Sequence, residues 1–266
     1  SPKQLPALFL LSCCRPLSLT QDKIINFGFT FRFNVELLQR VVPTGCGSLD
    51  KLLGGGILFN SVSLVYGEAE TGKTSLAIQC AVNSARMGYK AIFIDSDGTF
   101  SPRRLSQIAY HDSEEVSPSI ILVTPTTFEE QALAIDHLDE YLTKKVGLVV
   151  VDTITSLYRV ELGGPKETFT LNRELGRQVA CLAQIAKAHA VATLIISQVR
   201  GIFVEEHVGI EPVATRTLKF WSDVVLNLKP TGQTRVIKAI LEKYPKQRYP
   251  KSCYLTIERT GIRDYA

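Results

Sequence analysis

The chain has 266 residues, of which 45% are hydrophobic and 21% charged, as is ordinary for a soluble globular protein. This length allows one α/β domain with a large core, and the net charge of +4 is too small to require a polyanionic partner. The six cysteines include no Cys-x-x-Cys pair and no His/Cys cluster with zinc spacing. We therefore expect free thiols and a cytoplasmic protein.

The first 34 residues differ from the rest of the chain. Their apolar run, residues 5–14, is too short to span a bilayer, and almost no basic residues precede it as they would in a signal peptide. We expect residues 1–34 to be an irregular extension that need not be native. Residues 35–266 are expected to form the folded core, without membrane contact.

After this extension, short β-rich runs alternate with helical periods. That order is typical of an α/β fold in which helices cover both faces of a mostly parallel sheet. The last three strands follow one another without helices between them, which predicts an antiparallel C-terminal edge. The predicted strands are 62–66, 90–95, 120–123, 146–151, 192–197, 224–228, 235–242 and 252–258, and the predicted helices are 48–54, 73–87, 102–110, 128–144 and 171–188.

A complete phosphate-binding loop, Gly-Glu-Ala-Glu-Thr-Gly-Lys-Thr, lies between a predicted strand and a predicted helix. Its backbone N–H groups and the helix N-terminus attract phosphate. Lys73 is expected to reach the β- and γ-phosphates, and Thr74 to help hold Mg²⁺. An accidental glycine-rich turn would lack this context, so we predict ATP with Mg²⁺ as the ligand. The predicted binding residues are Gly67, Glu68, Ala69, Glu70, Thr71, Gly72, Lys73, Thr74 and Ser75.

Polar residues also stand where three other predicted strands end. Asp152 follows an apolar strand and is predicted to hold the Mg²⁺ shell. Asp95 and Asp97 are both candidates to orient or deprotonate the attacking water, although Ser-Asp-Gly is also an ordinary surface turn. Gln198 is expected to sense the γ-phosphate. Because strand C-termini converge on the ligand in such sheets, we expect these side chains to meet.

Taken in order, these motifs resemble the core of the RecA-like recombinases. The segments that carry the resemblance are 67–74, 93–105, 148–159, 175–177 and 197–199, and 94–105 and 151–159 resemble the archaeal and eukaryotic branch. The short archaeal RadB paralogues are the most similar, because no helix-hairpin-helix domain precedes the core, the segment after Gln198 is compact and a basic hairpin follows. The resemblance covers about residues 41–264 and implies a RecA-like P-loop fold.

The resemblance also implies residue roles. Lys73 and Thr74 match the phosphate and Mg²⁺ ligands, Asp152 the Walker B acid, Gln198 the γ-phosphate sensor, and Arg104 the position that packs on adenine. The family usually has glutamate where Asp97 stands. Aspartate is one methylene shorter, and a misplacement of about 1 Å can cost about 100-fold in rate, so we expect slow hydrolysis.

Charge is concentrated near the C-terminus. Residues 229–251 hold seven Lys or Arg and one Glu, a net of +6, whereas residues 199–216 hold two Arg and three Glu, a net of −1. A basic strip with interleaved tyrosines fits single-stranded DNA, although charges on an exposed hairpin can also simply prevent aggregation. The resemblance favours DNA, and the predicted contacts are Lys243, Tyr244, Lys246, Arg248, Tyr249 and Lys251.

Three functions are consistent with these features. The first is a DNA-repair ATPase of mediator type, with weak ATPase, little strand exchange of its own and, as partners, DNA and a RadA-type recombinase or a junction-processing nuclease. The second is a signalling ATPase of KaiC type that does not act on DNA, which the basic strip argues against. The third is a protein-interaction module that binds nucleotide structurally, which the aspartate at position 97 supports.

Overall fold

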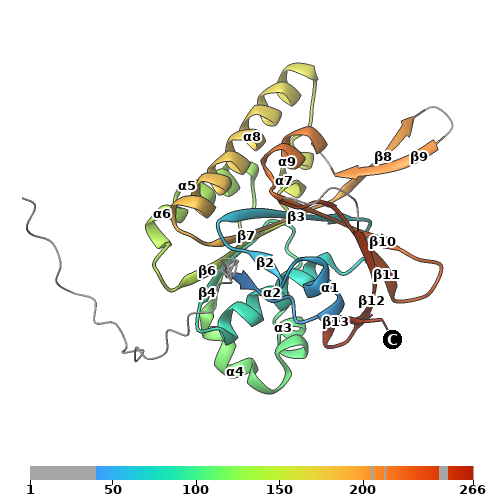
Figure 1. Cartoon of the computed structure of the whole chain (residues 1–266). Helices are drawn as coiled ribbons and strands as arrows, with labels where there is room; N and C mark the ends of the chain where they lie inside the picture. The colour runs from blue at the N-terminus through green and yellow to red at the C-terminus, as the bar shows by residue number, and fades with distance from the viewer. Residues whose placement is uncertain (1–39, 205–206, 213, 246–250, 266) are drawn as a thin grey trace, which may run out of the picture. The chain divides into compact units, whose positions relative to one another are not determined.

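A computed structural model describes residues 40–265, except 205–206, 213 and 246–250 (Figure 1). A nine-stranded sheet has the order β13-β12-β11-β10-β3-β7-β6-β4-β5. Neighbours from β10 to β5 are parallel, and those from β10 to β13 are antiparallel, which confirms the predicted fold class and its edge. The strands are β3 (Ser61–Gly67), β4 (Lys90–Asp95), β5 (Ile120–Val123), β6 (Val146–Asp152), β7 (Ala192–Ser197), β10 (Val224–Pro230), β11 (Val236–Lys243), β12 (Lys251–Glu258) and β13 (Gly261–Asp264).

Helices cover both faces of the parallel part (Figure 1). One face packs on α1 (Gly47–Leu52), α2 (Lys73–Arg86), α3 (Pro102–Ala109) and α4 (Ser113–Val116), with the 3-10 turns η1 (Tyr110–Asp112) and η2 (Ser117–Ser119) beside them. The other face packs on α5 (Phe128–Asp136), α6 (Leu138–Tyr141), α7 (Ser156–Val160), α8 (Pro165–Ala188) and α9 (Thr215–Trp221). No helix in the described part of the chain is long and apolar enough to cross a membrane.

Some elements differ from the expectation. The predicted helix 128–144 is two helices, because the chain turns at His137 and α6 ends at Tyr141. The long helix α8 begins six residues earlier than predicted, since Pro165 fits its first turn and Glu167 accepts the Gly164 N–H.

Several short elements were not predicted at all. The segment after Gln198 forms a two-stranded hairpin and then a helix, where the sequence had indicated only a compact segment. A second small pair of strands precedes the core sheet. These elements include β8 (Val199–Val204), β9 (His207–Pro212), α4, α7, α9, β1 (Val41–Val42), β2 (Ile57–Leu58) and β13.

The strand register brings the motif residues to one edge of the sheet. Asp95 pairs with Asp152, and Tyr66, which precedes the phosphate loop, pairs with Ser197, which precedes Gln198. β3, β6 and β7 are buried throughout and mostly apolar, as is typical of central parallel strands, and their charged or amide-bearing residues follow at the carboxyl ends. The parallel arrangement therefore builds the site from four separate segments.

Candidate nucleotide site

A pocket of about 590 Å³ opens over the phosphate loop at the carboxyl edge of the sheet. The pocket collects residues from five segments that are separated in the sequence. Besides the loop, it is lined by Asp97, Thr99, Thr153, Arg159, Gln198, Val199 and Ile257. The sequence had singled out Asp97 and Gln198, but not Thr99, Thr153, Arg159 or Ile257, whose places depend on how the chain folds.

Two glycines are required in the phosphate loop for steric reasons. Gly72 has φ +80°, and a Cβ there would lie 2.7 Å from Cδ1 of Ile262. A Cβ on Gly67 would lie 2.1 Å from the carbonyl oxygen of Leu228. Both positions therefore exclude larger side chains, and the loop backbone can approach a phosphate closely.

The Lys73 side chain points back into the phosphate loop. Its ammonium donates a hydrogen bond to the carbonyl oxygen of Glu68, and Thr71 donates to the same oxygen at 2.8 Å. Burial lowers the pKa of Lys73, while the nearby Asp152 and Asp97 carboxylates oppose this shift. A cation held by oxygen acceptors of the phosphate loop is arranged for a phosphate ligand.

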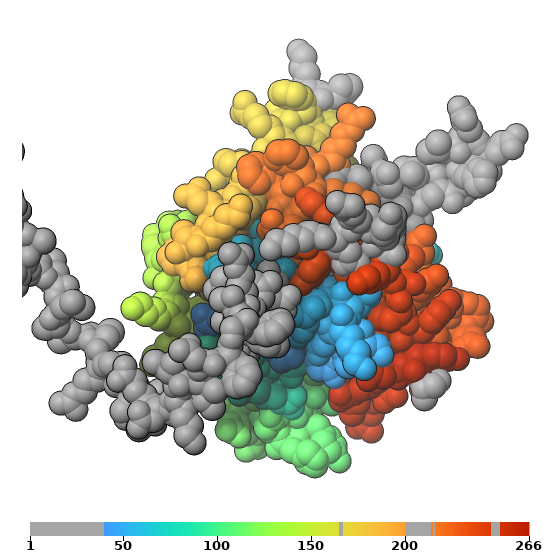
Figure 2. Space-filling model, in the orientation of Figure 1, coloured from blue at the N-terminus to red at the C-terminus, as the bar shows by residue number. Residues whose placement is uncertain are grey.

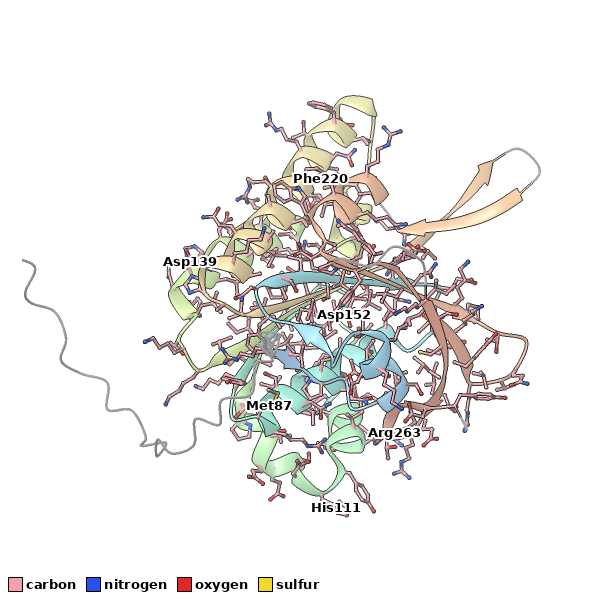
Figure 3. All side chains as sticks on the ribbon, viewed as in Figure 1. Met87, His111, Asp139, Asp152, Phe220 and Arg263 are labelled. Atoms are coloured by element: carbon pink, nitrogen blue, oxygen red, sulfur yellow. The ribbon has the colours of Figure 1, made fainter. Side chains whose placement is uncertain are left out.

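Asp152 lies in the interior at the end of β6 (Figure 3). Neither of its carboxylate oxygens has a hydrogen-bond partner of ordinary geometry among the described residues. Burial raises the pKa of Asp152 to about 7. The nearby Thr74 hydroxyl opposes this shift, and the Asp95 and Asp97 carboxylates add a smaller increase.

A buried carboxylate without partners is costly unless a ligand completes it. Asp152 and the Thr74 hydroxyl together fit the protein side of a Mg²⁺ site that is shared with phosphates. The described residues contain no cluster of three or more His, Cys, Asp or Glu side chains that could hold a metal. Asp152 and Thr74 are the residues that would hold a Mg²⁺ ion beside nucleotide phosphates.

The structure separates the two aspartates that the sequence left open. Asp95 is buried, and its carboxylate accepts the N–H groups of Thr99 at 3.1 Å and Phe100 at 2.9 Å, so it holds the turn together. Asp97 instead lines the pocket and accepts a hydrogen bond from Nε2 of Gln198 at 3.3 Å. Asp97 is thus the better placed of the two for chemistry.

Gln198 is also bound on its other side. Arg159, which lines the pocket, donates to Oε1 of Gln198. The amide therefore links an aspartate and an arginine at the pocket mouth. Such a side chain can respond to a phosphate by exchanging partners.

Arg104 lies beside the pocket rather than in its lining. Its guanidinium donates to Oγ of Ser75 at 2.9 Å and to the carbonyl oxygens of Arg259 at 2.7 Å and Glu258 at 3.1 Å. It thereby ties the β12–β13 turn to the start of α2. The predicted contact of Arg104 with adenine stays a prediction.

The predicted DNA contacts are divided by the structure. Lys243 donates to the carbonyl oxygens of Lys219 and Ser222, and the Tyr244 hydroxyl donates to that of Leu53 at 3.0 Å. Both side chains thus have a role inside the fold, whereas Lys251 is exposed. The remaining candidates, Lys246, Arg248 and Tyr249, lie outside the described residues.

The fold and the site define the class of RecA-like phosphate-loop proteins. A model of the Rad51 family matches residues 36–265. The chain is 33% identical over 224 residues to the DNA repair and recombination protein RadB of Methanosphaera stadtmanae, covering 84% of this chain and 95% of the relative. It is 38% identical over 229 residues to the RadB of Thermococcus gammatolerans, covering 84% and 99%.

The crystal structure of the RadB recombinase matches with a TM-score of 0.74 and 34% identity, covering 85% of this chain and 100% of that one. The chain therefore belongs to the Rad51 family and groups there with the RadB proteins, as the sequence motifs had indicated.

Proposed function

We propose that this chain binds ATP, Mg²⁺ and DNA and acts in homologous recombination and DNA repair as a recombinase mediator or paralogue. The observation that carries the proposal is the pocket in which Lys73, Asp97 and Gln198 meet around a complete phosphate loop, with the buried Asp152 close to Lys73. The names of the RadB relatives support the role in repair. The proposal includes a cytoplasmic location and, as protein partner, a RadA-type recombinase or a junction-processing nuclease.

Each residue has a distinct part in ATP hydrolysis. The loop N–H groups and Lys73 hold the β- and γ-phosphates, and Thr74 with Asp152 hold the ion. When bound, Mg²⁺ neutralises phosphate charge and so assists departure of the leaving group. Asp97 orients the attacking water and accepts its proton, and Gln198 senses whether the γ-phosphate is present.

The proposed ATPase is weak. The short Asp97 side chain keeps its carboxylate further from the phosphate than glutamate would, and Gln198 already binds that carboxylate. A base that must leave another partner before it acts is poorly preorganised. We therefore infer slow turnover and little strand exchange without a partner recombinase.

The short Asp97 side chain, already bound by Gln198, also supports a second candidate function. This is a protein-interaction module that uses nucleotide only to stabilise its fold. The two functions differ in how nucleotide and DNA affect each other. In the mediator, DNA raises ATP turnover and binding to DNA weakens with salt. In the interaction module, ATP raises the thermal midpoint and DNA changes nothing.

One experiment separates these functions. ATP turnover is measured with and without single-stranded DNA, and DNA binding is measured with and without ATP over a salt series. Turnover that DNA stimulates, together with salt-dependent DNA binding, supports the mediator. ATP binding without any DNA binding overturns it in favour of the interaction module, and absence of ATP binding overturns both.

A further inference from the structure

The four C-terminal strands carry a row of two lysines and two tyrosines on one face. The register places Lys229 opposite Lys238, and Lys238 opposite Tyr254. On β13 and the residue after it, the register continues so that the rings of Tyr254 and Tyr265 lie 6.1 Å apart. We call these four residues the lysine–tyrosine row.

This row faces away from the helices that cover the strands. The alternate residues of β11 and β12, such as Leu241 and Leu255, are buried in the cluster that contains α1 and α2. Because side chains alternate along a strand, the row lies on the opposite face. The C-terminal strands form one flank of the described core (Figure 2).

The tyrosine rings are accessible. Tyr254 is 48% exposed and Tyr265 is 45% exposed. Beside them is a hollow of about 360 Å³, bordered by the turn 231–233 and by Val236. The Tyr265 hydroxyl bonds to Oε1 of Gln233 at 3.1 Å, which fixes the ring at the edge of this hollow. Ring faces that stand open beside a hollow can accept a flat ligand.

The lysines of the row carry charge that the fold does not neutralise. Neither Lys229 nor Lys238 has an ion pair among the described residues, and they stand directly opposite each other. Like charges in this position destabilise a sheet. The Lys238 ammonium lies 5.6 Å from the centre of the Tyr254 ring, so a ligand stacked on the ring would lie beside the cation. An anionic ligand would relieve the repulsion.

The nearby carboxylates do not offset these lysines. Glu242 on β11 accepts hydrogen bonds from Lys219 at 2.8 Å and Tyr66 at 2.6 Å. Asp264 bonds to the start of α1, on the covered face. Glu258 is four residues from Tyr254 along β12, which is about 13 Å. Arg263, on the same face of β13, adds another cation (Figure 3).

We propose that the lysine–tyrosine row is a contact site for single-stranded DNA. Unpaired bases would stack on Tyr254 and Tyr265, and Lys229 and Lys238 would neutralise the adjoining phosphates. Duplex DNA keeps its base faces stacked inside and cannot use the rings. The inference rests on the proposed function only in that the ligand is DNA, and it adds two tyrosines, Tyr254 and Tyr265, that lie outside the basic segment 229–251.

The lysine–tyrosine row is also close to the nucleotide pocket. Ile257 of β12 lines the ATP pocket, whereas Tyr254 and its neighbour Thr256 face the other side of the same strand. DNA and ATP would therefore bind to opposite faces of β12. If one ligand displaces this strand, the affinity for the other ligand would change.

The test uses oligo(dT), a single strand without base pairing, and fluorescence anisotropy over a salt series. Tyr254→Ala and Tyr265→Ala should each weaken binding at least about fivefold, which corresponds to about 1 kcal/mol, the lower end of base–aromatic stacking. Tyr254→Phe keeps the ring and should bind as the unchanged chain does. Lys229→Ala with Lys238→Ala should flatten the slope of log affinity against log salt by about 1.4.

Two controls make the outcome decisive. Tyr141→Ala removes an exposed tyrosine on α6, far from the row in sequence and fold, and should change nothing. Oligonucleotides that contain 5-iodouracil should crosslink to Tyr254 or Tyr265 in the unchanged chain, which mass spectrometry can locate without any variant. If the unchanged chain binds oligo(dT) but the tyrosine variants bind equally and crosslinks map elsewhere, only this inference is overturned. If the unchanged chain binds no DNA, the DNA part of the proposed function fails with it.

Discussion

Gln198 donates a hydrogen bond across 3.3 Å to Oδ2 of Asp97, although the two residues are 101 positions apart in the sequence. The amide that follows β7 thus holds the carboxylate that follows β4, at the mouth of a pocket floored by the phosphate loop. The contact connects the proposed phosphate sensor with the proposed base.

Asp97 should limit the chemistry. Asp97→Asn should lose about 100-fold or more of the ATPase rate, because an amide cannot accept the proton of the attacking water. Asp97→Glu should equal or exceed the unchanged chain, since the longer side chain brings the carboxylate nearer. Steady-state phosphate release measures both, and Glu114→Gln, an exposed change on α4, serves as the control. Normal hydrolysis by Asp97→Asn would place the base elsewhere.

ATP binding should depend on Lys73. Lys73→Ala removes the cation of the phosphate loop and should weaken ATP binding at least about tenfold, or about 1.4 kcal/mol, because charge-assisted bonds to phosphate are strong. Calorimetry with Mg²⁺ present measures the affinity. Lys90→Ala removes an exposed lysine at the far end of β4 and should have no effect. Equal affinity in the Lys73 variant would contradict the assignment of the site.

Asp264 should stabilise the fold in a pH-dependent way. Its carboxylate accepts the Ser48 N–H at 2.6 Å at the start of α1, and the backbone and Cys46 bonds lower its pKa to about 2. Since this pKa is depressed, the stabilisation is present above the unfolded value near pH 4 and is lost as the pH falls through about 2.

Asp264→Ala should therefore reduce the free energy of unfolding at pH 7 by about 1 kcal/mol, the usual size of a helix cap. The difference from the unchanged chain should shrink between pH 4 and pH 2. Denaturant unfolding at several pH values measures it, with Glu114→Ala as the control. A difference that does not depend on pH would show that the charge of Asp264 is unimportant.

The basic segment should divide into structural and DNA-binding cations. Lys243→Ala should cost about 0.5–1 kcal/mol of stability, because two carbonyl oxygens at the end of α9 lose their donor, and it should leave the salt slope unchanged. Replacement of Lys246, Arg248 and Lys251 together by alanine should flatten the slope for single strands by about 2. If the triple variant keeps the full slope, these three residues do not contact DNA and form only a solvated edge. ATP affinity should remain constant in both variants.

Sequence alone determined the parts of this protein that local chemistry fixes. The phosphate loop needs glycines, a lysine and a threonine in a short run, so residues 67–74 predicted a nucleotide ligand without a fold. Apolar strands alternating with helical periods likewise indicated a covered parallel sheet, and that sheet predicted that residues at strand ends would meet. The resemblance to a family followed from the same local motifs.

Tertiary structure decided what depends on residues far apart. Asp95 and Asp97 look equivalent in sequence, and only the fold shows that Asp95 bonds the following turn while Asp97 meets Gln198. The cap of α1 comes from Asp264, 216 residues away from Ser48. Likewise, the antiparallel register brings Lys238 of the basic segment opposite Tyr254, which lies outside that segment, because only residues at matching positions on one face of neighbouring strands can act together.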